Sequence, residues 1–249
     1  MIKPLIAANW KMNMTTGESV IFAKRLAEEF ARLEDRDVVI APPYISLYPV
    51  AKIVRNSAIH LAAQNIHWEK EGAYTGEISA PMLSDIGCQY VLVGHSERRT
   101  LFGESNEEVN RKVKAAQAAG LKPIFCIGET LNERESGRAF DILAQQIKEG
   151  LNNIAPDDIG SVTFAYEPVW AIGTGKTATT QEAQEAHRFI RGEISKIFGE
   201  EVASEGAIIY GGSVKVDNIA GLMDQPDING ALVGGASLDF ESFAKIIKY

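Results

Sequence analysis

The chain has 249 residues, of which 25 are basic and 33 acidic, so its formal net charge is −8; hydrophobic residues make up 45%. This length and composition supply a large core, which excludes a disordered, collagen-like or disulfide-dense protein. The acidic balance argues against a nucleic-acid partner, and no apolar run reaches the roughly 18 residues that would span a membrane.

Short apolar runs rich in β-forming residues alternate along the chain with segments of helical periodicity. The predicted strands are 5–10, 37–41, 59–65, 90–94, 121–127, 161–166, 206–210 and 228–233. Several read as continuous apolar runs, which indicates burial on both faces of a parallel sheet. Eight strand–helix units in about 250 residues fit a closed barrel better than an open sheet. We therefore expect an α/β protein with one domain over 1–249, a (β/α)8 barrel.

Sequence signals also mark the ends of predicted helices. Capping-box spacing is present at Thr15 with Glu18, at Ser105 with Glu108 and at Thr179 with Glu182. Gly120 and Gly199 follow long helical patterns, and we expect both to adopt the left-handed conformation that ends a helix.

Two features bear on the cellular compartment. Cys88 and Cys126 form neither a disulfide framework nor a metal-binding pattern, and the four histidines lack metal-ligand spacing. The chain turns apolar by Leu5, which leaves no room for a signal peptide. We expect a cytoplasmic protein without a membrane anchor.

Polar residues cluster where the predicted strands end. Asn9 and Lys11 end the first strand, where the two-residue period of a strand places them on one side. The fourth strand ends in His95, Ser96 and Glu97, and the sixth in Glu167; the seventh and eighth end in 211–213 and 234–235. The carboxyl ends of parallel barrel strands share one face, which is where barrel enzymes carry their active sites.

Each of these residues also has a purely structural interpretation. Lys11 would then be a solvated charge, His95 a hydrogen-bonded core histidine and Glu167 an ion-paired carboxylate. Because the three residues are expected at the same end of the barrel, we favour a functional site that contains all of them. His60 is isolated within an apolar strand and is expected to be structural. A desolvated Glu167, extended before Pro168, suits a general base.

Two glycine-bearing segments suggest how an anion is held against the net charge. The pairs 211–212 and 234–235, each expected to precede a helix, are suited to hold phosphate with main-chain amides, although such glycines also permit tight turns. The loop 168–177 carries Val169, Trp170 and Ile172, which we expect to be exposed, as in a lid over a ligand. The loop is not a P-loop, because Trp170 stands where the first glycine of that motif is required. It is not a dinucleotide-binding fingerprint either, because no acidic residue ends the next strand.

Taken together, these segments resemble the triosephosphate isomerase family over nearly the whole length of the chain. The matching motifs are Asn9-Trp10-Lys11-Met12-Asn13, 94–99, Cys126-Ile127-Gly128-Glu129, 165–176, 210–214 and 232–237. Ala8 departs from the glycine usual in the family.

The resemblance implies a TIM barrel that interconverts dihydroxyacetone phosphate and D-glyceraldehyde 3-phosphate through an enediolate, in glycolysis and gluconeogenesis, without a metal or organic cofactor. Glu167 would be the base, a neutral His95 would polarise the carbonyl, and Lys11 and Asn9 would stabilise negative charge. Glu97 would orient Lys11 and His95. The amides of Gly173, Ser213, Gly234 and Gly235 would hold the phosphate. These roles follow the family pattern.

The partner and two alternatives complete the expectations. The connection 65–79 carries Trp68 and Tyr74, which suit an interface. The resemblance implies a homodimer in which this loop reaches the partner's site, with Thr75 near it; the alternative is a loop packed on a monomer. The alternative functions are another phosphosugar enzyme, such as a Schiff-base aldolase using Lys11, and an inactive phosphate-binding barrel.

Overall fold

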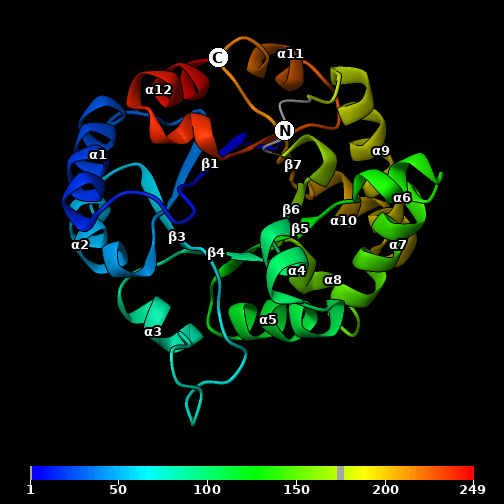
Figure 1. Ribbon diagram of the computed structural model, residues 1–249, viewed down its shortest axis with the longest axis horizontal. Coiled ribbons are helices and arrows are strands. Elements are labelled where there is room, and N and C mark those ends of the chain that lie inside the picture. Colours follow the sequence, from blue (N-terminus) through cyan, green and yellow to red (C-terminus); the bar gives the residue numbers. More distant parts are fainter. Residues whose placement is uncertain (1, 173–176) are drawn as a thin grey trace.

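The computed structural model of the protein describes residues 2–172 and 177–249. Its strands close into a parallel barrel in the order β1 to β8, with β8 paired to β1 (Figure 1). They are β1 (Leu5–Asn9), β2 (Asp37–Ala41), β3 (Ile59–Ala63), β4 (Tyr90–Val93), β5 (Lys122–Ile127), β6 (Thr163–Tyr166), β7 (Ile208–Tyr210) and β8 (Gly230–Val233). The predicted (β/α)8 barrel is confirmed.

Helices surround the barrel (Figure 1). They are α1 (Thr16–Glu29), α2 (Tyr44–Val54), α3 (Ala80–Asp85), α4 (Ser96–Phe102), α5 (Asn106–Ala118), α6 (Leu131–Glu135), α7 (Ala139–Gly150), α8 (Pro156–Ile159), α9 (Thr180–Phe198), α10 (Glu200–Glu205), α11 (Ile219–Met223) and α12 (Phe240–Lys248), with short 3₁₀ helices η1 (Val169–Ala171) and η2 (Gly235–Leu238). Across the described ranges, none of the helices is both long and apolar enough to cross a membrane.

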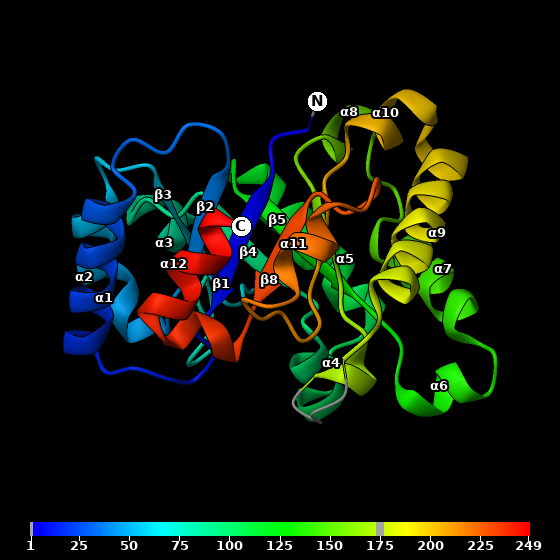
Figure 2. The same cartoon turned by 90° about the horizontal axis from the view of Figure 1, so that it is seen from above.

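The barrel has two distinct ends. Figure 2 shows α4 and α6, which follow strands, at one end, and α8 and α10, which precede β6 and β7, at the other. Alternate strand residues supply two apolar clusters: Leu5 and Ala7 belong to one, and Ile6 and Ala8 to the other, which also contains the buried faces of the helices. This alternation is the two-residue period of a strand buried on both faces.

Several strands are shorter than their apolar runs predict. Ile228 is buried, yet β8 begins at Gly230, and Val162 is buried, yet β6 begins at Thr163. An apolar run records burial of side chains, which extends beyond the residues whose backbones pair in the barrel. The number and order of the strands are as predicted, and only their ends differ.

The three predicted capping boxes are present, and Thr130 with Glu133 forms another at the start of α6. Gly120 has the expected positive φ of 73°. The expectation for Gly199 is wrong, because its φ of 98° is combined with a ψ of 159°, outside the left-handed helical region. The chain enters α10 at the next residue, so Gly199 ends one helix and begins another.

Candidate active site

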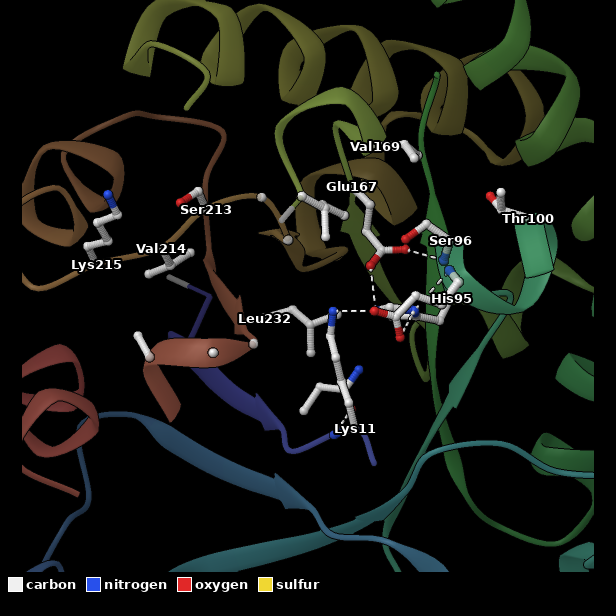
Figure 3. Close-up of a pocket in the computed structure, with 18 of the residues that line it drawn as sticks. Lys11, His95, Ser96, Thr100, Glu167, Val169, Ser213, Val214, Lys215 and Leu232 are labelled. Carbon is white, nitrogen blue, oxygen red and sulfur yellow. Dashed lines mark hydrogen bonds and ion pairs between the residues drawn. The ribbon is translucent and has the colours of Figure 1, made fainter. Parts of the chain in front are cut away.

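A cavity of about 570 Å³ lies at the carboxyl ends of the strands (Figure 3). Eight of the predicted site residues line it: Asn9, Lys11, His95, Glu97, Glu167, Ser213, Gly234 and Gly235. Gly173 lies outside the described residues, as does the 173–176 part of the predicted lid. Thr75 is exposed on the 65–79 connection and does not line the cavity of its own chain.

Lys11 points into the cavity because of a turn after β1, and not because of the two-residue alternation of the strand. β1 ends at Asn9, and Lys11 has a positive φ of 53°, so the expected alternation stops before it. The buried Asn9 side chain accepts a hydrogen bond from the Lys11 N–H at 3.0 Å, and Gln64 donates to the Lys11 carbonyl at 2.8 Å. Two hydrogen bonds therefore hold the turn that points Lys11 inward. Its Nζ lies 2.5 Å from Glu97 Oε1.

His95 and Glu167 form a buried pair, although β5 separates the strands β4 and β6 that they follow. His95 Nε2 lies 2.9 Å from Glu167 Oε1, and the Ser96 N–H donates to Glu167 Oε2 at 2.8 Å (Figure 3). Glu167 is 1% exposed and His95 6% exposed. Both carboxylate oxygens thus have a partner inside the protein.

The surroundings of His95 act on its charge in opposite directions. Burial lowers the pKa of His95, but the nearby charge and hydrogen bond of Glu167 outweigh it, so the pKa is raised above its ordinary value. The Glu97 N–H donates to His95 Nδ1 at 3.2 Å, which requires that nitrogen to carry no proton. In a neutral His95 the proton would therefore sit on Nε2, whereas the carboxylate charges of Glu167 and Glu97 both favour the protonated ring.

Glycines leave the space that the Glu167 backbone and side chain occupy. A Cβ on Gly128 would lie 1.7 Å from the Glu167 carbonyl oxygen, and one on Gly211 would lie 2.9 Å from Glu167 Cγ. Gly128 lies in one of the matching motifs, but nothing in the sequence predicts its role. Its closeness to Glu167 arises because β5 and β6 are neighbours.

Ser213 lies across the cavity from His95 (Figure 3), and Gly234 and Gly235 also line it. Among the described residues, their main-chain N–H groups have no acceptor within the protein. Free N–H groups facing a cavity suit an anion. A Cβ on Gly234 would lie 3.9 Å from Lys11 Nζ, so these amides and the ammonium border the same space. A helix follows each glycine pair as expected: η2 starts at Gly235, and α11 begins at Ile219, after a short connection from the 211–212 pair.

The predicted exposure of Val169, Trp170 and Ile172 is wrong, since all three are half-buried. Trp170 Nε1 donates to Glu129 Oε1 at 2.8 Å, and the Tyr166 hydroxyl donates to the same oxygen at 3.1 Å. Glu129 is fully buried and lies in one of the matching motifs, but the sequence predicts no role for it. It anchors the first part of the loop, a function that no local pattern in the sequence indicates.

His60 lies away from the cavity, as its structural interpretation predicted. It is on β3, with Nε2 3.7 Å from Asp37 Oδ1. The interaction with His60 and the nearby Lys3 lower the pKa of Asp37 to about 2, although partial burial acts in the opposite direction. His60 therefore stabilises a surface carboxylate.

Comparisons with known proteins show the family to which the whole chain is similar. The family model described as Triosephosphate isomerase matches residues 4–249. A protein of Syntrophotalea carbinolica is 51% identical over all of this chain and 99% of its own length, and one of Carboxydothermus hydrogenoformans is 52% identical over 100% and 99%. One of Chloroflexus aurantiacus is 51% identical over 99% and 98%. All three relatives carry the name triosephosphate isomerase.

Proposed function

The chain belongs to the triosephosphate isomerase family, and from this premise we propose that it interconverts dihydroxyacetone phosphate and D-glyceraldehyde 3-phosphate. The reaction moves one proton between neighbouring carbons through an enediolate and places the protein in glycolysis and gluconeogenesis. The single observation that carries the proposal is the buried carboxylate–imidazole pair of Glu167 and His95 inside a cavity that also holds Lys11.

Glu167 is the proposed general base. Its carboxylate leaves the Ser96 N–H and His95, takes the carbon-bound proton and returns it to the adjacent carbon. Gly211 gives the side chain room beside β7, and Gly128 lets the Glu167 backbone lie close to β5. This close packing restricts where the Glu167 carboxylate can lie, and a misplacement of about 1 Å can reduce the rate of proton transfer about 100-fold.

His95 is proposed to polarise the carbonyl and to move protons between the two substrate oxygens. With Nδ1 accepting from the Glu97 N–H, the proton of neutral His95 resides on Nε2, the nitrogen that faces Glu167. Lys11 and Asn9 are proposed to stabilise the negative charge of the enediolate, and Glu97 orients Lys11 through their ion pair.

The amides of Ser213, Gly234 and Gly235 are the proposed phosphate ligands. Ser213 lies across the cavity from His95 (Figure 3), and Gly234 and Gly235 line the same cavity, so a phosphate bound at Ser213 would lie away from His95. Gly173 is assigned the same role from the family pattern, although it lies outside the described residues.

An assay in both directions tests the proposal. Purified protein is given dihydroxyacetone phosphate or D-glyceraldehyde 3-phosphate, and the product is oxidised or reduced by a coupling dehydrogenase. Turnover in both directions supports isomerisation. Absence of turnover in both directions would favour the alternative that the protein is an inactive phosphate-binding barrel. A Schiff-base aldolase using Lys11 would instead be trapped as a covalent adduct by borohydride in the presence of substrate.

We also propose a homodimer built on the 65–79 connection. This loop projects from the barrel beside α3 (Figure 1). Tyr74 is 44% exposed, and its ring stands 4.3 Å from that of His67, which also stacks on Trp68. Exposed apolar side chains on nearby segments, Ile45, Met82 and Phe102, extend the surface. A surface of this kind is typical of an interface, with Thr75 directed to the partner's cavity.

The cytoplasm is the proposed location. Cys88 and Cys126 are both buried free thiols, a state that fits a reducing compartment, and the proposed substrates are intermediates of central metabolism.

A further inference from the structure

The acidic groups of the cavity and the net charge of the chain oppose the binding of an anion. Two carboxylates, Glu97 and Glu167, line it, and the whole chain carries a net charge of −8. The charge of Lys11 is offset by Glu97 at 2.5 Å. A triose phosphate carries nearly two negative charges near neutral pH, so the field of the protein opposes its approach.

Lys215 differs from Lys11 in having no acidic partner within the described chain. It lines the cavity on the side of Ser213 and Val214, across from His95 and Thr100 (Figure 3). Its side chain is exposed, so its ammonium is available to a ligand arriving from solvent.

The backbone of Lys215 is fixed by Asn218. The Lys215 N–H donates to Asn218 Oδ1 at 2.8 Å, and Asn218 Nδ2 donates to the Ser213 carbonyl at 2.9 Å. The Lys215 carbonyl accepts from the Ile219 N–H at 3.1 Å. The Asn218 side chain therefore joins the main chain of Lys215 to that of Ser213, the residue that supplies a proposed phosphate-binding amide.

From this arrangement we propose that Lys215 is the residue that draws the substrate phosphate into the cavity. The inference rests on the proposed function and adds a residue to it. Lys215 acts before chemistry, through its charge at the phosphate end, and it is neither a proton donor nor an acceptor in the reaction. Its effect therefore belongs in kcat/KM and not in kcat, and it is weakened by salt.

The test compares Lys215→Gln, Lys215→Glu and Lys215→Arg with the parent protein at low and at high ionic strength. Lys148→Gln is the matched control, because Lys148 is also exposed and lacks an ion pair in the described chain, but lies in the last turn of α7, toward the other end of the barrel. At low ionic strength we expect kcat/KM to fall about 3- to 10-fold in Lys215→Gln and further in Lys215→Glu, with kcat unchanged. Lys215→Arg keeps the parent value, and the differences shrink at high ionic strength.

Two results would overturn the proposal. One is a salt dependence of kcat/KM in Lys215→Gln that equals that of Lys148→Gln; the other is a loss confined to kcat. Calorimetric titration with inorganic phosphate at low ionic strength gives a readout that needs no turnover, and it should show weaker binding in Lys215→Glu. If the parent protein binds phosphate through Lys215 but does not isomerise, the proposed function fails and the anion-attracting role stands. If the parent protein isomerises and the Lys215 variants match the control, the proposed function stands and the anion-attracting role of Lys215 fails.

Discussion

His95 Nε2 lies 2.9 Å from Glu167 Oε1, although the two residues follow strands that do not pair with each other. They meet because both side chains turn toward the barrel axis at the same end of the barrel. The contact also explains the raised pKa of His95, since the carboxylate that causes it is the group proposed to leave for the substrate. Substrate binding is therefore expected to separate the pair and favour neutral His95.

Glu167→Asp should retain the fold and lower turnover. The carboxylate retreats by about one bond length, and a displacement near 1 Å can reduce the rate about 100-fold. Isomerase activity and the thermal midpoint are measured together on the same sample. Turnover close to that of the parent protein would remove Glu167 from the proposed mechanism.

His95→Asn separates the chemical role of His95 from its structural one. Asparagine retains an acceptor for the Glu97 N–H at the start of α4, since it is a favourable N-cap residue, but it lacks Nε2. We expect turnover to fall about 10²- to 10⁴-fold, as for loss of an acid–base group, with little change in thermal midpoint. His95→Gln provides a second variant. Unfolding of both would show that the histidine is chiefly structural.

Gly211→Ala should impair turnover through a change in packing. The added Cβ would lie 2.9 Å from Glu167 Cγ and 3.1 Å from the Tyr166 carbonyl oxygen, so the Glu167 side chain must shift. We expect turnover to fall at least about 10-fold and the free energy of unfolding to drop by about 1–3 kcal/mol. Gly160→Ala is the control, because nothing lies within 4 Å of its added Cβ. Equal activity in the two variants would contradict the prediction.

His187 should make the protein less stable in mild acid. It is fully buried beside Tyr166, with Nδ1 2.7 Å from the Ala183 carbonyl oxygen. Burial, partly opposed by hydrogen bonds to backbone carbonyls, lowers the pKa of His187 from 6.5 to about 4. The unfolded chain therefore binds the proton first, so this stability is complete above pH 6.5 and is lost as the pH falls toward 4.

The expected loss over this window is about 3 kcal/mol. Urea unfolding near neutral pH and near the lower limit of the window measures it in the parent protein and in His187→Gln. The glutamine variant is expected to have a lower free energy of unfolding near neutral pH but a smaller decrease on acidification. An identical decrease in both proteins would assign the acid sensitivity to other groups.

Tyr74→Glu should weaken the proposed homodimer. A charge replacing an aromatic interface residue is expected to raise the dissociation constant at least about 100-fold. Light scattering across micromolar concentrations gives the mass, and activity is measured over the same range. Ile21→Glu on α1, which also replaces an exposed apolar side chain, is the control. A fully active monomer in the parent protein would refute the pairing itself.

The sequence by itself determined the barrel, because burial on both faces leaves continuous apolar runs and capping boxes mark where helices begin. It also placed Asn9, Lys11, His95, Glu167, Ser213 and the 234–235 pair at one face, since the carboxyl ends of parallel strands share it. Those predictions need only local patterns and one rule of topology.

Tertiary structure decided the contacts between distant elements. The inward turn of Lys11 depends on its positive φ and on Gln64, and the partial burial of Trp170 depends on Glu129. The close approach of Gly128 to Glu167 and the tether between Asn218 and Ser213 likewise arise when the chain folds back on itself. Such contacts join residues whose separation in sequence carries no periodic signal, so distance in space, and not spacing along the chain, determines them.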